Sequence, residues 1–553
     1  MSMFAIGLSG LNAARNALNT VSNNVSNINT PGFNREITQL AEGVSGGGVR
    51  VDNIERQFNT YVANQLNNAK TQSSALNTYY GQVSQIDNLL ADRTAGLAPL
   101  MQGFFSSLED MASAPSDPAA RQGVLGTANT LSSQFRSFDG YLQDMQSNIN
   151  SQINDEITQI NNTTEQIAGL NKEIALARAR SGEAPNGLLN QRDHLVSQLN
   201  ERMDLRLNVQ DGKTYNISLP NGQPLVTGTN TFKLEAIQSD YDPQRTIVGY
   251  RDGGGNLVQL NESTIKGGAL GGLMTFRSET LDKTQNQIGQ LAVSLSVAFN
   301  EQHRQGVDLD GQQGGDFFSV RAPQAYSHPD NLSDIATIEF DADNIDQLRA
   351  VDYTVRFEGG APVVQRNDTG AAIDIGDGWD AATNTLNFGG INLTFSDTPA
   401  PQDGDRFEIQ PVRRAANGME VNIADTDKIA AGQPINPEDD PADWVASGSG
   451  DNRNALALQN LQAASIVGGR ASVSGAYASI VSDVGNRTNI TEVNLDARQG
   501  LTDQLRAVQQ SESGVSIDEE MANLIRYQQY YMANARVIDT AGTLMDTILN
   551  LRG

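Results

Sequence analysis

The sequence predicts a multidomain α+β protein whose N- and C-terminal helices pair as a coiled-coil core, with a long helical rod domain and two inserted β-rich domains. Three observations carry this prediction: matching apolar spacing at both chain ends, long helical patterns beside them, and two interior stretches with a two-residue period. At 553 residues the chain is too long for one hydrophobic core, so several domains are expected.

The charge of the chain is unevenly distributed. Residues 1–34 contain one charged side chain, Arg15, and residues 521–553 carry three arginines against two aspartates, so each end is close to +1. Taking both ends from the formal net charge of −27 leaves −29 on residues 35–520. The acidic excess argues against nucleic-acid binding, and only the middle is built to face water.

Other bulk features narrow the class of protein. The mean hydropathy is −0.40, and no apolar run approaches the roughly 18 residues that cross a bilayer, so no membrane insertion is expected. The N-terminus lacks the basic and apolar regions of a signal peptide, so general secretion is not indicated. The absence of cysteine excludes disulfides and cysteine-ligated metals.

The N-terminal segment predicts a coiled-coil helix. A 3,4 spacing of non-polar residues runs through Phe4, Gly7, Leu11, Ala14, Leu18, Val21, Val25 and Ile28. Thr30-Pro31-Gly32 ends this helix, because proline disfavours the α conformation of the residue before it. The alternation in Val49-Arg50-Val51 suggests a short hairpin, so we assign residues 1–56 to a core helix and hairpin.

The C-terminal segment mirrors the first. The same spacing passes through Ile517, Met521, Leu524, Gln528, Tyr531, Ala535, Ile538, Gly542, Met545 and Leu549. Ser516 followed by three acidic residues marks the start of this helix, because acidic side chains favour the positive helix end. Residues 513–553 therefore form a second core helix, which pairs with residues 1–56 in either orientation.

The middle of the chain alternates between helical and β patterns. Residues 57–204 read as long helices broken near 115–118 and 182–187, and together with 273–304 and 452–512 they form the rod domain. Period-two patterns and turn glycines predict two β-rich domains. These domains cover residues 205–272 and an outer segment, 305–451.

The two ends predict self-assembly. An isolated 27-residue helix is marginal in water and leaves its apolar seam exposed, and the polar back face carries Ser and Asn in place of charges, so copies can pack without burying ions. The proposed self-assembly core is Phe4, Leu8, Leu11, Leu18, Val21, Val25, Ile28, Ile517, Met521, Leu524, Tyr531, Ile538, Met545 and Leu549. Closure of a monomeric stalk is the alternative, whereas a membrane-surface helix is disfavoured because the polar face carries only Arg15.

Catalytic and metal-binding patterns are missing. The three histidines, His194, His303 and His328, form no metal motif or triad, and the first two are expected to be packing or surface groups. Asp308-Leu309-Asp310-Gly311 lacks the remaining ligands of a calcium loop and is expected to be a turn, and Gly267–Gly272 a domain joint. Composition leaves a glycosidase carboxylate pair open, but no compact site indicates one. We therefore expect no enzyme, cofactor or metal.

Sequence motifs at both ends resemble the flagellar rod, hook and hook-associated axial proteins. The N-terminal stretch Ser22 to Phe33 is similar to their first signature, and Asp518 to Val537 is similar to their last. The residues that carry the motif are Asn24, Asn27, Thr30, Pro31, Gly32, Phe33 and Asn534. Interior segments 190–196, 291–303 and 316–318 resemble the hook-associated members, whereas residues from about 319 to 451 match nothing specific.

This resemblance implies a structural subunit that polymerises at the hook–filament junction and connects the hook to the filament. It implies export of the unfolded chain by the flagellar type III apparatus to an extracellular position. The implied partners are further copies in a homo-oligomeric ring, hook protein, hook-associated protein 3 and a dedicated export chaperone that binds the C-terminal region. A secreted adhesin or host-facing binding protein with a helical stalk is the alternative from another class.

Overall fold

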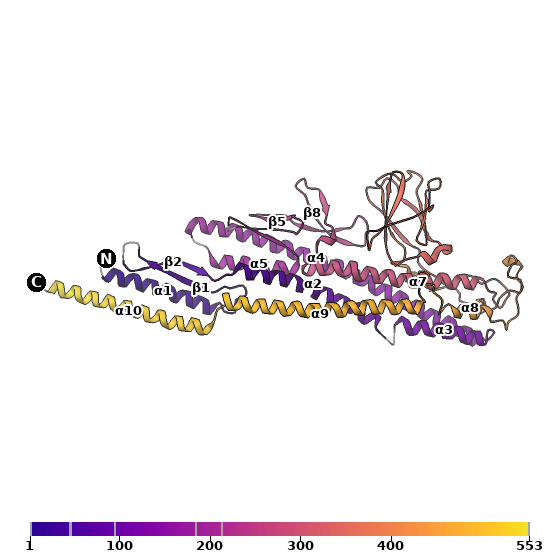
Figure 1. The fold of residues 1–553 in the computed structure, drawn as a ribbon, viewed down its shortest axis with the longest axis horizontal. Coiled ribbons are helices and arrows are strands. Elements are labelled where there is room, and N and C mark those ends of the chain that lie inside the picture. The colour runs from indigo at the N-terminus through magenta and orange to yellow at the C-terminus, as the bar shows by residue number, and fades with distance from the viewer. Residues whose placement is uncertain (1–2, 44–46, 93–95, 183–184, 212–213, 551–553) are drawn as a thin grey trace.

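A computed structural model describes residues 3–43, 47–92, 96–182, 185–211 and 214–550. The molecule is long and narrow, and both termini lie at the same end (Figure 1). Long helices run along its length, and two β-rich regions stand on one side of them. This mixed architecture, with long terminal helices and an inserted β-rich part, confirms the predicted fold class.

The terminal helices pair antiparallel. They are α1 (Met3–Ser26) and α10 (Ile517–Asn550). Strands β1 (Glu36–Glu42) and β2 (Val49–Arg56) form the expected hairpin, which lies along α1. The chain leaves α1 through a turn in which Gly32 has a φ of 78°, a left-handed conformation that favours glycine.

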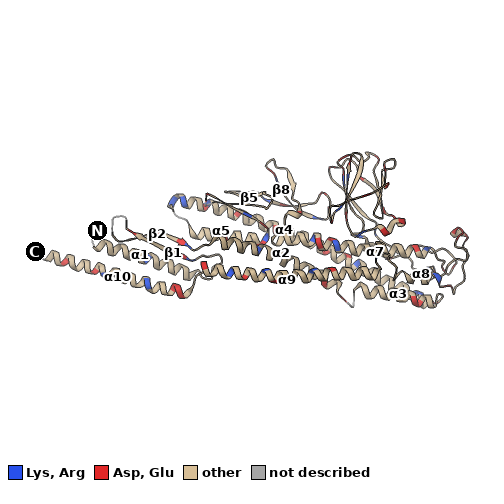
Figure 2. Cartoon of the chain, viewed as in Figure 1, with Lys and Arg blue, Asp and Glu red and all other residues tan. Residues whose placement is uncertain are grey.

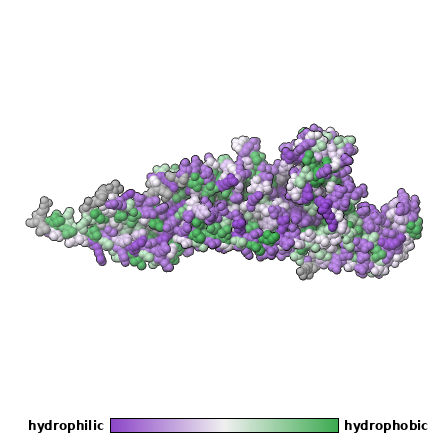
Figure 3. Space-filling model, in the orientation of Figure 1, coloured by the Kyte–Doolittle hydropathy of each residue, from purple (hydrophilic) through white to green (hydrophobic). Residues whose placement is uncertain are grey.

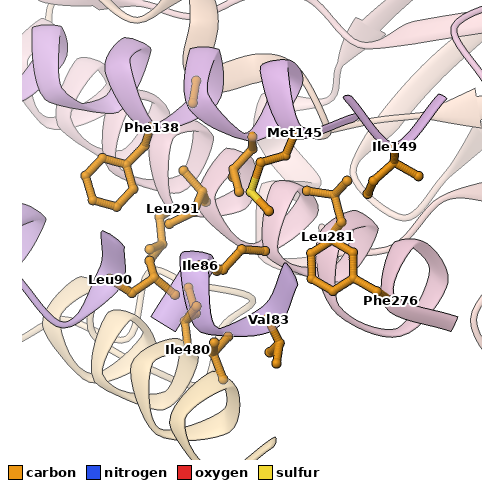
Figure 4. Close-up of a cluster of buried hydrophobic side chains, with 14 of the residues drawn as sticks. Val83, Ile86, Leu90, Phe138, Met145, Ile149, Phe276, Leu281, Leu291 and Ile480 are labelled. Atoms are coloured by element: carbon orange, nitrogen blue, oxygen red, sulfur yellow. The ribbon is translucent and has the colours of Figure 1, made fainter. Parts of the chain in front are cut away.

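The rod consists of helices from three parts of the chain. They are α2 (Thr60–Leu90), α3 (Leu97–Ser113), α4 (Pro118–Ser181), α5 (Asn186–Arg202), α6 (Gly268–Phe276), α7 (Asp282–Arg304), α8 (Arg453–Asn460) and α9 (Val473–Ser513). A short π-helical segment, Arg277–Leu281, joins α6 to α7. One continuous apolar core holds these helices together (Figure 4), and it includes Val83, Ile86, Leu90, Phe138, Met145, Ile149, Phe276, Leu281, Leu291 and Ile480.

The predicted helix breaks are present and have local causes. Asp117 caps the N-terminus of α4 by accepting from the Ala119 amide at 2.9 Å, and Pro118 occupies the first turn, where a missing amide costs nothing. Gly182 ends α4 in a left-handed conformation. These two sites match the breaks expected near 115–118 and 182–187.

Two further breaks were not predicted. A connection separates α2 from α3, and residues 461–472 separate α8 from α9 within the segment 452–512 that was assigned to the helical rod. Within the second break, Gly468 and Gly469 have φ values of 55° and 67°, which are incompatible with a helix at these positions. Ser472 then caps α9 by accepting from the Gly475 amide at 3.2 Å.

The first β-rich region packs against α4. Its strands are β3 (Arg206–Gln210), β4 (Thr214–Ser218), β5 (Pro224–Thr227), β6 (Asn230–Thr231), β7 (Leu234–Gln238), β8 (Thr246–Arg251) and β9 (Leu257–Gln259). They form an antiparallel four-stranded sheet in the order β3-β4-β5-β6 and a three-stranded sheet in the order β7-β8-β9.

The outer β-rich region has its own apolar core between residues 325 and 415, whereas Phe318 and Val421 pack on the core of the rod. Its strands are β10 (Phe318–Ser319), β11 (Gln324–Ser327), β12 (Ile335–Phe340), β13 (Tyr353–Glu358), β14 (Ala361–Arg366), β15 (Ala372–Ile373), β16 (Trp379–Asp380), β17 (Thr385–Phe388), β18 (Ile391–Phe395), β19 (Arg406–Gln410) and β20 (Glu420–Val421). A five-stranded sheet, β11-β19-β13-β14-β15, and a four-stranded sheet, β12-β18-β17-β16, contribute to one core. The rod thus separates this region from the terminal helices (Figure 1).

The glycine segment expected to be a joint opens α6. An added Cβ at Gly268 would lie 2.2 Å from the backbone of Arg202 and Met203, and one at Gly272 would lie 2.4 Å from the Ala75 carbonyl oxygen. These glycines therefore let α6 approach α5 and α2 more closely than any larger residue allows.

Candidate assembly surface

The contact between α1 and α10 is built on small side chains. The buried residues of α1 are Gly7, Gly10, Ala13, Ala14, Ala17, Thr20, Val21 and Asn24. An added Cβ at Gly7 would lie 2.8 Å from Ile538 Cγ1, and one at Gly10 would lie 2.2 Å from Asn534 Oδ1. The helices can therefore approach closely only because these positions carry no side chain.

This contact lies to one side of the seam that the 3,4 spacing predicts. Gly7, Ala14 and Val21 of the seam are buried, but Phe4, Leu8 and Ile28 are exposed. Leu11, Leu18 and Val25 are half-buried at the edge of the contact. The reason is that α1 and α10 approach closely, so only glycine and alanine fit at the centre of their contact. The large side chains therefore lie at its edge or in solvent.

The same arrangement holds on α10. Leu524, Ala535 and Ile538 are half-buried against α1, whereas Ile517, Met521, Tyr531, Met545 and Leu549 are exposed. Phe4 is 52% exposed and Met521 is 48% exposed. The two helices therefore contact each other through small residues. The large apolar side chains predicted from the sequence form a surface on the helix pair.

We call this surface the apolar face, and it comprises the exposed and half-buried large side chains on the side of the helix pair turned away from the hairpin. Helical geometry, at 3.6 residues per turn, places them on that side, because the hairpin covers the opposite flank of α1. Its residues are Phe4, Leu8, Leu11, Leu18, Val25, Ile517, Met521, Leu524, Ile525, Tyr531 and Met532.

The apolar face carries little charge. Figure 2 shows a single charged position on α1, which is Arg15, and charged positions at intervals along α10. None of the residues of the apolar face is charged. The space-filling view shows green side chains at this end, mixed with purple ones, as it also does along the rod (Figure 3). Exposed apolar surface without charge repulsion is typical of a protein–protein interface.

Polar residues of both terminal motifs meet at the base of the pair. Glu520 is buried, and its carboxylate accepts from Arg35 Nε at 2.7 Å and from Asn24 Nδ2 at 3.2 Å. Asn24 also exchanges two hydrogen bonds of 2.9 Å with the backbone of Glu36. Arg35 pairs in addition with the exposed Glu519 at 2.6 Å. This cluster fixes α10 against α1 and the hairpin.

The remaining motif residues shape the turn after α1 and its joint with the rod. Asn27 donates to the Asn23 carbonyl at 2.9 Å, and Thr30 donates to Asn27 Oδ1 at 3.1 Å. Pro31 and Phe33 line a groove of about 390 Å³ between this turn, α2, α5 and α9.

A second part of this joint depends on a close contact and on interior polar residues. An added Cβ at Gly32 would lie 2.7 Å from His194 Cβ, so only glycine fits there. Asn34 donates to Asn190 Oδ1 at 2.7 Å, and Arg56 pairs with Asp193 at 2.6 Å. The interior segment 190–196 therefore belongs to the joint between the terminal helices and the rod.

Sequence reasoning missed a buried charge cluster between the rod and both β-rich regions. Arg413 pairs with Asp242 at 3.1 Å, with Asp282 at 3.6 Å and with Asp352. Burial, together with Asp352, raises the pKa of neighbouring Glu408 to about 8. The available signal was two charged residues, Glu408 and Arg413, within and directly after the segment 407–412, in which Phe407 and Ile409 alternate with polar residues.

The histidines and the aspartate turn match their structural expectations. His303 is fully buried, with Nδ1 2.7 Å from the Gly315 carbonyl oxygen and Nε2 2.9 Å from the Ala430 amide nitrogen. His194 is half-buried. The Gly311 amide donates to the Asp308 carbonyl at 3.1 Å, and Lys428 pairs with Asp308 and Asp310. The segment is a turn whose charge is neutralised by a lysine.

No group of three or more His, Cys, Asp or Glu side chains could hold a metal ion within the described parts of the chain. Across the same residues, no helix combines the length and apolar character needed to span a membrane.

Comparisons with known proteins identify the family. Residues 83–318 match the model of the flagellar hook-associated protein FlgK helical domain, residues 4–34 match that of flagella basal body rod protein, and residues 509–551 match that of flagellar basal body rod FlgEFG protein C-terminal. The first match ends at the residue beyond which the sequence showed no specific resemblance.

Full-length relatives indicate the same family as these models. The chain is 41% identical to flagellar hook-associated protein 1 of Salmonella typhimurium over 563 residues and to that of Escherichia coli over 561 residues, covering 100% of both chains in each case. The solved structure of the flagellar hook junction protein FlgK from Burkholderia pseudomallei has a TM-score of 0.74 and 28% identity, and the match covers 82% of this chain and 100% of that one. The chain belongs to the flagellar hook-associated protein 1 (FlgK) family.

Proposed function

We propose that this chain is a structural subunit of the bacterial flagellum that polymerises at the hook–filament junction and connects the hook to the filament. The observation that carries the proposal is the apolar face of the α1/α10 pair, large and nearly uncharged, at one end of an otherwise acidic molecule. Family membership supports the same function. It favours this function over a stalked adhesin, whose activity would depend on the outer β-rich region.

The energetics of the apolar face favour association. Burying a large apolar side chain contributes about 1.5–3 kcal/mol when it starts fully exposed, so a half-exposed one contributes roughly 1 kcal/mol. Several such side chains, among them Phe4, Leu8, Met521 and Ile525, lie on one surface. Their combined burial is large enough to offset much of the loss of translational and rotational freedom on association.

The residues named from the sequence have a defined place in this proposal. The large side chains on the apolar face contact neighbouring copies, the small residues Gly7 and Gly10 hold the pair together, and the motif residues fix its base. The two β-rich regions lie along the rod, away from the terminal helices (Figure 1), so they can be displayed outward from a core of packed helices.

The proposed domain division is 1–56, the rod 57–204 with 273–304 and 452–512, the β-rich domains 205–272 and 305–451, and 513–553. A core formed by residues 348–415 with Val293 of α7 supports the middle of the fourth unit, whereas Phe317, Phe318, Met419 and Ile429 near its ends pack in the core of the rod. Limited proteolysis of the purified chain tests the division, because cuts are expected at the boundaries, and a cut inside the β13–β14 hairpin before any boundary cut would contradict it.

The proposed partners are further copies of the chain in a ring, hook protein on one side, hook-associated protein 3 on the other, and a dedicated chaperone before export. The last part of α10 supports the chaperone contact. Leu544, Met545, Ile548 and Leu549 are all exposed, since this part has little contact with α1. An apolar helix end of this kind needs a partner during export.

We further propose export through the flagellar type III apparatus to an extracellular position, and a role without catalysis. Membership of a flagellar structural family supports both statements. Assays for turnover on peptidoglycan with purified protein test the second, since any hydrolysis dependent on a carboxylate of the outer region would contradict it.

A deletion series tests the junction function. In a strain without the native gene, the full chain is expected to restore filaments on hooks and swimming, and a chain lacking residues 3–28 is expected to restore neither. Electron microscopy of purified hooks gives the readout. Filaments on hooks in the deletion strain would contradict the proposal, as would absence of the full chain from hook–basal bodies, which is the outcome an adhesin predicts.

A further inference from the structure

A small groove lies between α1, α10 and the hairpin, on the side of the helix pair opposite the apolar face. It encloses about 290 Å³. Its lining includes the small residues Gly10, Ala13 and Ala14 of α1, with Leu40 of β1 and Tyr527 and Tyr530 of α10. A groove with small residues and aromatic walls suits a large apolar side chain.

The groove and the apolar face are on opposite sides of the same two helices. On α10, Tyr527 and Tyr530 border the groove, whereas Ile525 and Met532 lie roughly half a turn around the helix at about 100° per residue. On α1, Gly10 borders the groove and Leu8 faces away from it by a comparable rotation.

Opposed surfaces of this kind imply a particular mode of association. A two-fold dimer would bring the same patch of each copy together, which would pair two apolar faces and leave both grooves empty. Contact between the apolar face of one copy and the groove of the next repeats indefinitely and generates a closed ring or a helix. This arrangement covers both surfaces of every copy.

The charges on the two surfaces are complementary. Arg15 is the only charged residue of α1; it is exposed, on the same side as Leu8 and Leu11, and has no ion pair with any described residue. Glu42 ends β1 on the strand face shared by Thr38 and Leu40, which points toward α1. It too is exposed and has no ion pair within the described ranges.

We propose that the groove beneath the hairpin is the socket for the apolar face of a second copy of this chain, with Arg15 of one copy paired with Glu42 of the next. This inference rests on the proposed function and adds the surface and direction of the subunit contact. The hairpin then acts in assembly as well as in packing, because it supplies one wall of the socket and its carboxylate.

Cysteine cross-linking tests the contact in the assembled junction. The chain has no cysteine of its own, so a short bis-maleimide reacts only at introduced thiols. The variant Arg15→Cys with Glu42→Cys is expected to give a ladder of multimers in purified hook–basal bodies. The matched control is Arg15→Cys with Gln39→Cys, because Gln39 is on the other face of the same strand, and it is expected to give no ladder.

Charge exchange gives an independent readout. Arg15→Glu alone and Glu42→Arg alone are expected to reduce swimming and filament attachment, and the double exchange is expected to restore both. Junctions that assemble and support swimming without a ladder in Arg15→Cys with Glu42→Cys would overturn the socket and leave the proposed function intact. Absence of the unaltered chain from hook–basal bodies would instead overturn the proposed function.

Discussion

At the scale of single residues, the two acidic neighbours Glu519 and Glu520 show how burial decides the value of a charge. Both pair with Arg35, but the side chain of Glu520 is 1% exposed and that of Glu519 is 62% exposed. A buried carboxylate with two donors is costly to remove because its partners lose their acceptor in a dry site. An exposed pair is screened by water.

The first prediction compares these two residues. Glu520→Ala is expected to destabilise the attachment of α10 by about 2–4 kcal/mol, because Arg35 and Asn24 lose a buried acceptor. Glu519→Ala, the matched control, is expected to cost less than about 1 kcal/mol. Hydrogen exchange of the α10 amides measures both. Equal protection in the two variants would show that the cluster does not fix α10.

The second prediction concerns His303. Burial lowers its pKa from 6.5 to about 4, so the folded state binds the proton less tightly than the unfolded chain. Above pH 6.5 the ring is neutral in both states, and its contribution to the free energy of unfolding is complete. As the pH falls from 6.5 toward 4, the unfolded chain binds the proton before the folded chain does, so the free energy of unfolding falls by up to about 1.4 kcal/mol per pH unit.

Denaturant titrations across that pH range check this prediction. The unaltered chain is expected to lose stability progressively below pH 6.5. His303→Gln is expected to be less stable at neutral pH but to show a shallower acid dependence. An identical slope for both chains would assign the acid sensitivity to other groups.

At the scale of elements, small residues decide which helices and strands come into contact. Gly289 of α7 is an example, because an added Cβ there would lie 1.8 Å from the Val412 carbonyl oxygen, directly before Arg413. Backbone atoms cannot move aside as a flexible side chain can. The outer region therefore approaches the rod at a distance that only glycine permits.

The third prediction compares a glycine in a tightly packed helix contact with a glycine on an open helix surface. Gly289→Ala is expected to destabilise the chain by about 1–3 kcal/mol, because the methyl group overpacks the interface between α7 and the outer region. Gly126→Ala in α4 is the control, since nothing lies within 4 Å of its added Cβ. It is expected to stabilise the chain by up to about 1 kcal/mol. Thermal unfolding measures both, and stabilisation by Gly289→Ala would contradict the account.

Local sequence patterns predicted some of the helix boundaries and missed others. Period and breaker residues located the terminal helices and the breaks at Pro118 and Gly182, because these signals are local. The break between α8 and α9 was missed, although the adjacent glycines Gly468 and Gly469 are a local turn signal, and both adopt left-handed conformations. The charge cluster around Arg413 joins segments more than 100 residues apart, which no local pattern reveals.

At the scale of the whole molecule, the uneven distribution of charge and apolar side chains separates two ends with different roles. The sequence predicted which residues form the apolar seams, but it did not predict that glycine and alanine would form the contact between α1 and α10. Only the packed pair shows that Phe4, Leu8 and Met521 are exposed. The assembly role of these residues remains a prediction.

The fourth prediction is the most direct test of the central claim that neighbouring copies bury the apolar face. Single cysteines replace Met521 on the apolar face and Thr369 in the outer region, and maleimide labelling is measured for the free chain and for purified hook–basal bodies. Labelling at position 521 is expected to fall at least about tenfold on assembly, because a group packed as in a protein interior reacts only after local opening. Labelling at position 369 is expected to stay unchanged. Equal labelling of Met521→Cys in the free and the assembled chain would contradict the account.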